Sequence, residues 1–155
     1  MTPLVAVARP IPFRSEALVM WASPRVGDVV VVESPVDGLD LVKRVVGLPG
    51  DVIEVRDGVL VRNGEVVPHA LSGPCDPADH MHWERACVVL EERVGERQWT
   101  TSRSVVGLGI TDVAPMVVPD RHLFVMGDHR DRSNDSRFFG PVPADHLRGR
   151  VLFVD

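Results

Sequence analysis

No run of apolar residues in this 155-residue sequence is long enough to cross a membrane. A membrane-spanning helix needs about 18 or more consecutive apolar residues. The stretch from Met1 to Phe13 is too short and too rich in proline to provide them. The sequence therefore predicts a soluble chain, or the soluble part of a longer one.

Clusters of basic residues are also absent, and the formal net charge is −5. A protein that binds nucleic acid usually presents a basic face to the phosphates, so a nucleic-acid partner is not expected. Internal repeats and low-complexity segments are lacking as well. At this length, these features predict one domain spanning residues 1–155.

Tyrosine is missing entirely, whereas valine is abundant and glycine and proline number 13 each. Valine favours strands, and glycine and proline favour turns. We therefore expect a mainly β fold with little helix. Prolines at positions 3, 10, 12 and 24 interrupt any long element in residues 1–24, for which we expect an irregular lead-in.

Short apolar or alternating stretches between turn residues predict the strands. Val29–Val32 is apolar on both faces, which indicates an interior strand. Asp57-Gly58 and Asn63-Gly64 supply the positive φ angles of tight turns, so residues 52–67 are expected to form a hairpin series. Further strands are expected at 41–46, 87–94, 98–106 and 151–154, and a short turn of helix at 141–146.

Cys75 and Cys87 are the only cysteines, and the surrounding residues 68–86 are polar and irregular. The two thiols can close one small loop in an oxidising compartment. With His80 and His82 they also form a C-x4-H-x-H-x4-C pattern, which matches no common zinc signature. A surface loop at 68–86, with or without a disulfide, is favoured over a metal site, and no cofactor is expected.

The most unusual stretch runs from Gly127 to Gly140, where six of fourteen positions are Asp or Arg. A charged run between apolar segments is usually a solvated turn. Carboxylates and guanidiniums interleaved with the hydroxyls of Ser133 and Ser136 can instead close a bidentate network that holds a loop in one shape. A loop held in this way can position a catalytic group.

A second candidate stretch runs from Leu41 to Asp51. On a strand, alternation places Lys43 and Arg44 on opposite faces. One interpretation is an edge strand whose two basic side chains both reach solvent. The other is that Lys43 lies among apolar neighbours, where loss of solvation lowers its pKa and leaves a neutral amine that can act as a base.

Both stretches, together with the turn and strand at residues 25–32, resemble signature boxes of the signal peptidase I family. Residues 127–140 match the last box except that His129 stands where the family has Asn, and residues 43–51 match the lysine box. The resemblance implies antiparallel sheets that form a partly open barrel. It also implies a serine endopeptidase that cleaves signal peptides from exported preproteins by a Ser/Lys dyad.

The resemblance implies roles for five residues of these boxes. Lys43 takes the place of the general base, and Ser133 that of the hydroxyl that hydrogen-bonds the lysine. Asp135 and Arg137 correspond to a supporting ion pair, and Asp128 is a further supporting residue of the same box. No metal is implied.

The family's nucleophilic serine has no direct counterpart. Counted back without gaps from Gly27 and Asp28, its position holds Val19, and with two residues inserted it holds Ala17. An aliphatic side chain cannot attack a carbonyl. Ser15 carries the nearby hydroxyl that a modest shift in position would bring to Lys43. It is therefore the candidate nucleophile.

Three alternatives stay open at this point. The stretch from Met1 to Leu4 can be the remnant of the serine box, with the serine preceding the sequence given. The chain can be a catalytically silent homologue that binds extended peptides by strand addition or serves as a structural module. A self-cleaving repressor-type peptidase uses the same chemistry, although the box at 127–140 favours the signal peptidase branch.

The apolar residues 17–21 also have two interpretations. In the structural one they form an apolar patch while Ser15 caps a turn. In the family such a patch contacts lipid, which assigns a membrane-surface contact to Met20 and Trp21. The resemblance further implies an extended peptide or preprotein substrate, and a place on the outer face of the cytoplasmic membrane or in the periplasm.

Overall fold

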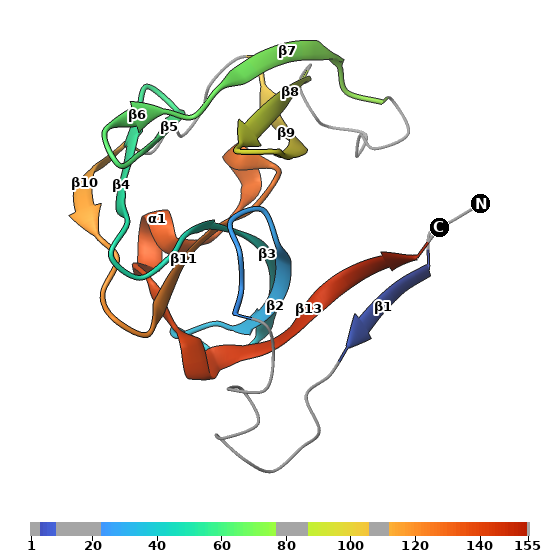
Figure 1. The fold of residues 1–155 in the computed structure, drawn as a ribbon. Coiled ribbons are helices and arrows are strands. Elements are labelled where there is room, and N and C mark those ends of the chain that lie inside the picture. Colours follow the sequence, from blue (N-terminus) through green and yellow to red (C-terminus); the bar gives the residue numbers. More distant parts are fainter. Residues whose placement is uncertain (1–3, 9–22, 77–86, 106–111, 155) are drawn as a thin grey trace.

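The computed structural model describes residues 4–8, 23–76, 87–105 and 112–154. Antiparallel strands in three sheets make up most of this part of the chain, and its helical segments are single turns (Figure 1). The sheets do not close into a complete barrel. The expected mainly β fold, with a partly open barrel and little helix, is therefore confirmed.

The largest sheet has six strands in the spatial order β1-β13-β2-β3-β11-β12, and all neighbours are antiparallel. The predicted interior strand lies between β13 and β3, with alternate side chains buried. The ribbon of β1 and β13 runs outward from the body of the molecule (Figure 1). The strands are β1 (Leu4–Ala8), β2 (Val29–Glu33), β3 (Asp40–Gly47), β11 (His122–Met126), β12 (Val142–Pro143) and β13 (Leu147–Val154).

The second sheet contains the predicted hairpin series and has the order β10-β4-β5-β6. Asp57 and Asn63 adopt φ angles of 51° and 54°, each followed by a glycine that also has positive φ. This is the geometry that tight hairpin turns need. The strands are β4 (Val52–Arg56), β5 (Val59–Arg62), β6 (Glu65–Val66) and β10 (Val113–Val117).

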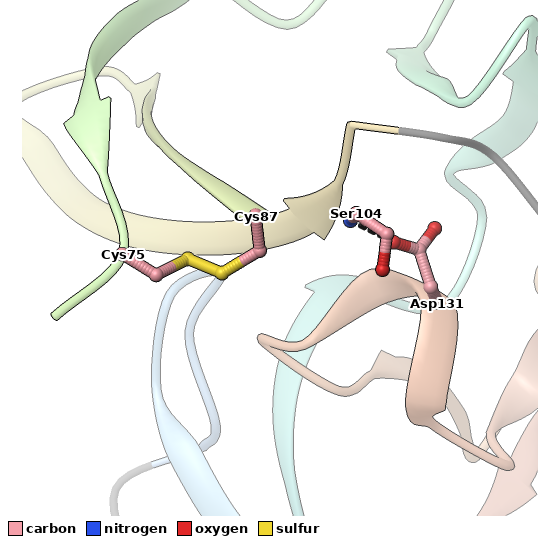
Figure 2. Close-up of a disulfide and its surroundings, with 4 residues drawn as sticks. All are labelled: Cys75, Cys87, Ser104 and Asp131. Carbon is pink, nitrogen blue, oxygen red and sulfur yellow. Dashed lines mark hydrogen bonds between the residues drawn. A yellow bond between two sulfur atoms is a disulfide. The ribbon is translucent and has the colours of Figure 1, made fainter. Parts of the chain in front are cut away.

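The third sheet consists of β7 (His69–Pro74), β8 (Cys87–Val94) and β9 (Arg97–Ser104). A disulfide joins Cys75 and Cys87, whose Cα atoms are 5.5 Å apart (Figure 2). Both sulfurs are thus engaged, and no three metal-ligating side chains cluster within the described ranges. His80 and His82 lie outside these ranges.

Two segments expected to be irregular contain strands. Residues 69–74 of the expected surface loop pair with β8, and residues 4–8 of the expected lead-in pair with β13. Most side chains of β7 are exposed, so the strand has no apolar period that could have revealed it. The prolines at positions 3 and 10 lie just outside β1 and do not interrupt it.

Strands β3 and β11 lie between two hydrophobic clusters. Consecutive residues pack into different clusters, so β11 and the C-terminal end of β3, at Val45 and Val46, are buried on both faces. This packing fixes the segments that continue from them, including Lys43 and Gly127. One cluster contains Val46, Ile53, Val55, Leu60, Val67, Val118, Phe124 and Met126, and the other contains Val30, Val32, Val45, Leu123, Val125 and Val142.

The helical turns are η3 (Arg130–Arg132), α1 (Ser136–Phe139) and η4 (Ala144–His146). The first two lie within residues 127–140, and the third confirms the turn of helix expected at 141–146. None of the helices in the described part of the chain is long and apolar enough to span a membrane.

Candidate active site

Lys43 and Ser133 meet although they are 90 positions apart in the sequence. Lys43 lies on β3, which has β2 on one side and β11 on the other. The edge-strand interpretation is therefore wrong. The half-buried Lys43 side chain donates a hydrogen bond from Nζ to Ser133 Oγ, at 2.8 Å.

Burial lowers the pKa of the Lys43 amine, because loss of solvation disfavours the charged form. The Asp135 carboxylate acts in the opposite direction, and the positive charge of Arg137 adds to the lowering. The net effect is a pKa below the ordinary lysine value. Such an amine is neutral more of the time near neutral pH, as a general base has to be.

Gly127 lies against this pair, and the space beside its Cα is already occupied. A Cβ atom on Gly127 would clash with the Oγ and Cβ atoms of Ser133 and would lie 3.6 Å from Lys43 Nζ. Its φ is not in the left-handed region, so glycine is required here for space alone. The Ser133 hydroxyl is therefore held between the backbone of Gly127 and the lysine amine.

Asp135 and Arg137 form the ion pair that the resemblance implies. Arg137 donates from Nε and Nη2 to the two carboxylate oxygens of Asp135, at 2.9 and 2.8 Å. The same carboxylate accepts the backbone N–H groups of Gly127 and Arg137, at 2.9 and 3.1 Å. Burial raises the pKa of Asp135, but the hydrogen bonds and the charge of Arg137 outweigh it, so the pKa is lowered. Asp135 is thus a buried anion that fixes Gly127.

Asp128 pairs with Arg44, on the other face of β3. Arg44 Nε and Nη2 donate to the two Asp128 oxygens at 2.8 and 2.7 Å, and Arg44 Nη1 donates to the Gly27 carbonyl at 2.8 Å. The guanidinium also lies 5.4 Å from the centre of the Trp99 ring. The predicted opposite orientation of Lys43 and Arg44 agrees with these separate partners.

A buried pair that sequence reasoning missed lies beside this site. Arg130 donates from Nη1 and Nη2 to the two oxygens of Glu92, both at 2.7 Å, and Trp99 Nε1 donates to Glu92 at 3.0 Å. The one available signal was strand alternation, which places Glu92 on the same face as Leu90 and opposite Glu91. The partner of Glu92 lies 38 positions away, beyond the reach of any local pattern.

The candidate nucleophile cannot be placed relative to Lys43. Ser15 lies outside the described residues, as do Ala17, Val19, Met20 and Trp21. Within those ranges, the serine hydroxyl hydrogen-bonded to Lys43 belongs to Ser133. The structure thus brings together Lys43, Ser133, Asp135 and Arg137, with Asp128 across β3, and leaves the place of Ser15 open.

Comparison with known proteins gives the same family from sequence and from structure. The family model described as signal peptidase, peptidase S26, matches residues 12–154. Signal peptidase I of Pseudomonas fluorescens is 31% identical over 156 residues, covering 93% of this chain and 53% of the relative. Signal peptidase I of Bacillus licheniformis is 33% identical over 130 residues, covering 83% and 57%.

The crystal structure of a signal peptidase I from Enterococcus faecalis aligns with a TM-score of 0.50 at 26% identity. The alignment covers 84% of this chain and 97% of that one. The chain spans about half the length of the curated relatives it matches. With the family model matching nearly its whole length, the chain belongs to the signal peptidase family, peptidase S26.

Proposed function

We propose that this protein is a signal peptidase I-like serine endopeptidase that cleaves signal peptides from exported preproteins, with Lys43 as the general base. The observation that carries the proposal is the half-buried Lys43 amine, whose Nζ lies 2.8 Å from Ser133 Oγ. The two stretches that contribute these residues are those that resemble the family's boxes. Family membership supports preprotein substrates.

The composition of the chain supports the same role. Lys43 is the only lysine among 17 Lys and Arg residues, so every other cationic side chain of this kind is an arginine. A guanidinium stays protonated in proteins, whereas a desolvated amine can lose its proton near neutral pH. The single lysine therefore lies where a base that titrates is required.

In the proposed reaction, neutral Lys43 accepts the proton of a serine hydroxyl while the serine oxygen attacks the scissile carbonyl. The ammonium then donates this proton to the leaving amine as the peptide bond breaks, which leaves the signal peptide as an ester on the serine. Water, deprotonated by the same amine, hydrolyses the ester. Ser133 accepts a hydrogen bond from the amine and so orients it.

Ser15 is the proposed nucleophile. Ser133 is hydrogen-bonded to Lys43, but it is only 9% exposed and is packed against Gly127, which leaves little room for a substrate carbonyl. Ser133 is therefore assigned to orientation and not to attack. Because Ala17 and Val19 occupy the serine's place in the two simplest alignments, the test below includes the outcome of a silent homologue.

The proposed place of action is the outer face of the cytoplasmic membrane or the periplasm, in agreement with the family. Met20 and Trp21 are proposed to contact the membrane surface. An apolar ring with a polar N–H is suited to the boundary between lipid and water. Such contact would bring the site close to membrane-inserted substrates.

The direct test is cleavage of a purified preprotein with an Ala-x-Ala-type site by the wild type and by Lys43→Ala and Ser15→Ala variants. We expect cleavage by the wild type and a loss of about 100-fold or more in both variants. Intact-mass analysis of the wild type after rapid acid quenching should reveal the signal peptide attached as an ester, and peptide mapping should locate it.

Each result of this experiment selects one hypothesis. An ester on Ser15 supports the proposal as stated. An ester on another serine retains the peptidase and corrects the nucleophile. Background cleavage by all three proteins, with peptide binding that survives Lys43→Ala, overturns the enzyme in favour of the silent homologue.

A further inference from the structure

The third sheet docks onto the loop of residues 127–140 at three points. Ser102 N donates to the Asp128 carbonyl at 2.9 Å. The backbone N–H of Ser104 donates to the Asp131 carboxylate, close to the disulfide end of β8 (Figure 2). The third point is the bidentate pair of Glu92 and Arg130. The β8–β9 hairpin is thereby attached along the outside of the loop.

The third contact differs from the other two because its charges are removed from water. The side chains of Glu92 and Arg130 are each 5% exposed. Such a pair loses much of its hydration on burial, and apolar residues of similar size often stabilise a fold equally well. Stability alone therefore gives little reason for this pair, whereas a role in orienting its neighbours does.

The neighbours of Arg130 lead directly to the lysine. Arg130 Nε donates to the Gly127 carbonyl at 3.1 Å, and the Arg130 carbonyl accepts Arg137 Nη2 at 2.7 Å. Gly127 is thus held by Arg130 at its carbonyl and by Asp135 at its N–H. The Ser133 hydroxyl packs against this glycine, and any displacement of the glycine moves the serine.

We propose that Glu92 is a positioning residue for the Lys43–Ser133 pair: it fixes the Arg130 guanidinium, which fixes the Gly127 backbone against which Ser133 packs. Trp99, paired with Glu92 across the β8–β9 hairpin, completes the orientation of the carboxylate. The effect on cleavage rests on the proposed function. The effect on the amine does not, and it can be measured in an inactive protein.

The test uses the single lysine as a reporter. Protein labelled with 13C at lysine Cε gives one lysine side-chain signal, whose pH titration reports the pKa of Lys43. In Glu92→Gln the buried Arg130 loses its negatively charged partner and one of its two acceptor oxygens, so we expect it to turn toward solvent and admit water to the loop. We expect the pKa of Lys43 to rise toward the ordinary lysine value.

The sign of this change separates repositioning from simple electrostatics. Removing a negative charge by itself lowers the pKa of a nearby amine, whereas opening the loop raises it. Glu91→Gln is the matched control, because it removes the adjacent carboxylate from the opposite side of the same strand. It should leave the titration of Lys43 as it is in the wild type.

A double variant, Glu92→Met with Arg130→Met, separates positioning from folding. Removing both charges together should leave the unfolding midpoint near that of the wild type, yet Gly127 loses its donor and the lysine titration should still shift. Where the wild type cleaves preprotein, we expect kcat to fall about tenfold with KM within about threefold.

The proposal is overturned if folded Glu92→Gln, or the folded double variant, shows a Lys43 titration like that of the wild type or one shifted downward. That result is distinct from failure of the proposed function. An inactive wild type with a titration that depends on Glu92 removes the peptidase and leaves the positioning role in place.

Discussion

The two faces of β3 hold neighbouring cations in contrasting ways. Arg44 lies on one face, 12% exposed, with a carboxylate, a carbonyl and an aromatic ring around it. Lys43 lies on the other face, and within the described ranges its hydrogen-bond partner is the neutral hydroxyl of Ser133. The two charges that shift its pKa, Asp135 and Arg137, are bonded to each other.

This difference shows how one strand can hold a permanent cation, Arg44, next to Lys43, a cation that can lose its proton. A bidentate carboxylate next to Lys43 would stabilise the ammonium and raise its pKa. A hydroxyl accepts one hydrogen bond from either form of the amine and leaves burial to decide the pKa. The face of Arg44 thus serves the structure, and the face of Lys43 is suited to proton transfer.

The largest expected effect on activity comes from replacing each cation of β3 by the other type, as in Lys43→Arg and Arg44→Lys. In Lys43→Arg the positive charge remains but cannot be given up, so we expect kcat/KM for a preprotein to fall by about 1,000-fold or more. In Arg44→Lys the proposed base is intact, and kcat/KM should stay within about tenfold. Cleavage by Lys43→Arg at a tenth or more of the wild-type rate would contradict the assignment of the base.

Crowding the Lys43 face is expected to have the next largest effect. In Gly127→Ala the new methyl group displaces Ser133, and kcat should fall about 100-fold with a loss of about 1–3 kcal/mol in stability. Adding Ser133→Gly makes room for the methyl group but removes the hydroxyl. The double variant should therefore regain the unfolding midpoint without regaining activity, and recovery of both would mean that the hydroxyl is dispensable.

On the Arg44 face, the expected effect is on stability. Arg44→Met leaves Asp128 and the Gly27 carbonyl without their donor, and we expect the free energy of unfolding in urea to fall by about 1–3 kcal/mol. Arg56→Met is the control, because the pair of Arg56 and Glu54 involves a guanidinium that is 62% exposed. A change of about 0.5 kcal/mol or less is expected there. Equal losses of unfolding free energy in Arg44→Met and Arg56→Met would contradict a special structural role for Arg44.

The smallest expected effect concerns the loss of stability caused by burying the Lys43 amine. Because the folded-state pKa of Lys43 is lowered, the unfolded state binds more protons between that pKa and the ordinary value, and wild-type stability rises with pH in this window. Lys43→Met should therefore be slightly more stable than the wild type at pH 7, by about 1 kcal/mol or less. This advantage should shrink as the pH approaches the ordinary lysine pKa, as urea unfolding at a series of pH values can determine.

The features that could be predicted from the sequence are those specified by residues close together along the chain. The turns at Asp57 and Asn63 depend on two adjacent residues each, and the valine-rich β2 depends on five. The contact of Lys43 with Ser133 was expected because two separate boxes resembled those of one family. In each case the signal lay within a short window or within a known combination of windows.

The remaining features depend on partners that a local pattern does not encode. Strands β1 and β7 owe their structure to pairing with β13 and β8, which their own residues do not specify. The role of Glu92 is visible only once β8 lies beside Arg130. Likewise, the constraint on Gly127 comes from Ser133 packing against its Cα and not from an unusual backbone angle.

The double anchoring of Gly127 also links the chemistry to the local opening of the loop. If the hydrogen bonds that Gly127 donates to Asp135 and accepts from Arg130 break together, water reaches Lys43, and its pKa returns toward the ordinary lysine value. The fraction of time spent closed then sets an upper limit on turnover. The rate of hydrogen exchange of the Gly127 amide, whose proton is bonded to Asp135, measures how often the loop opens.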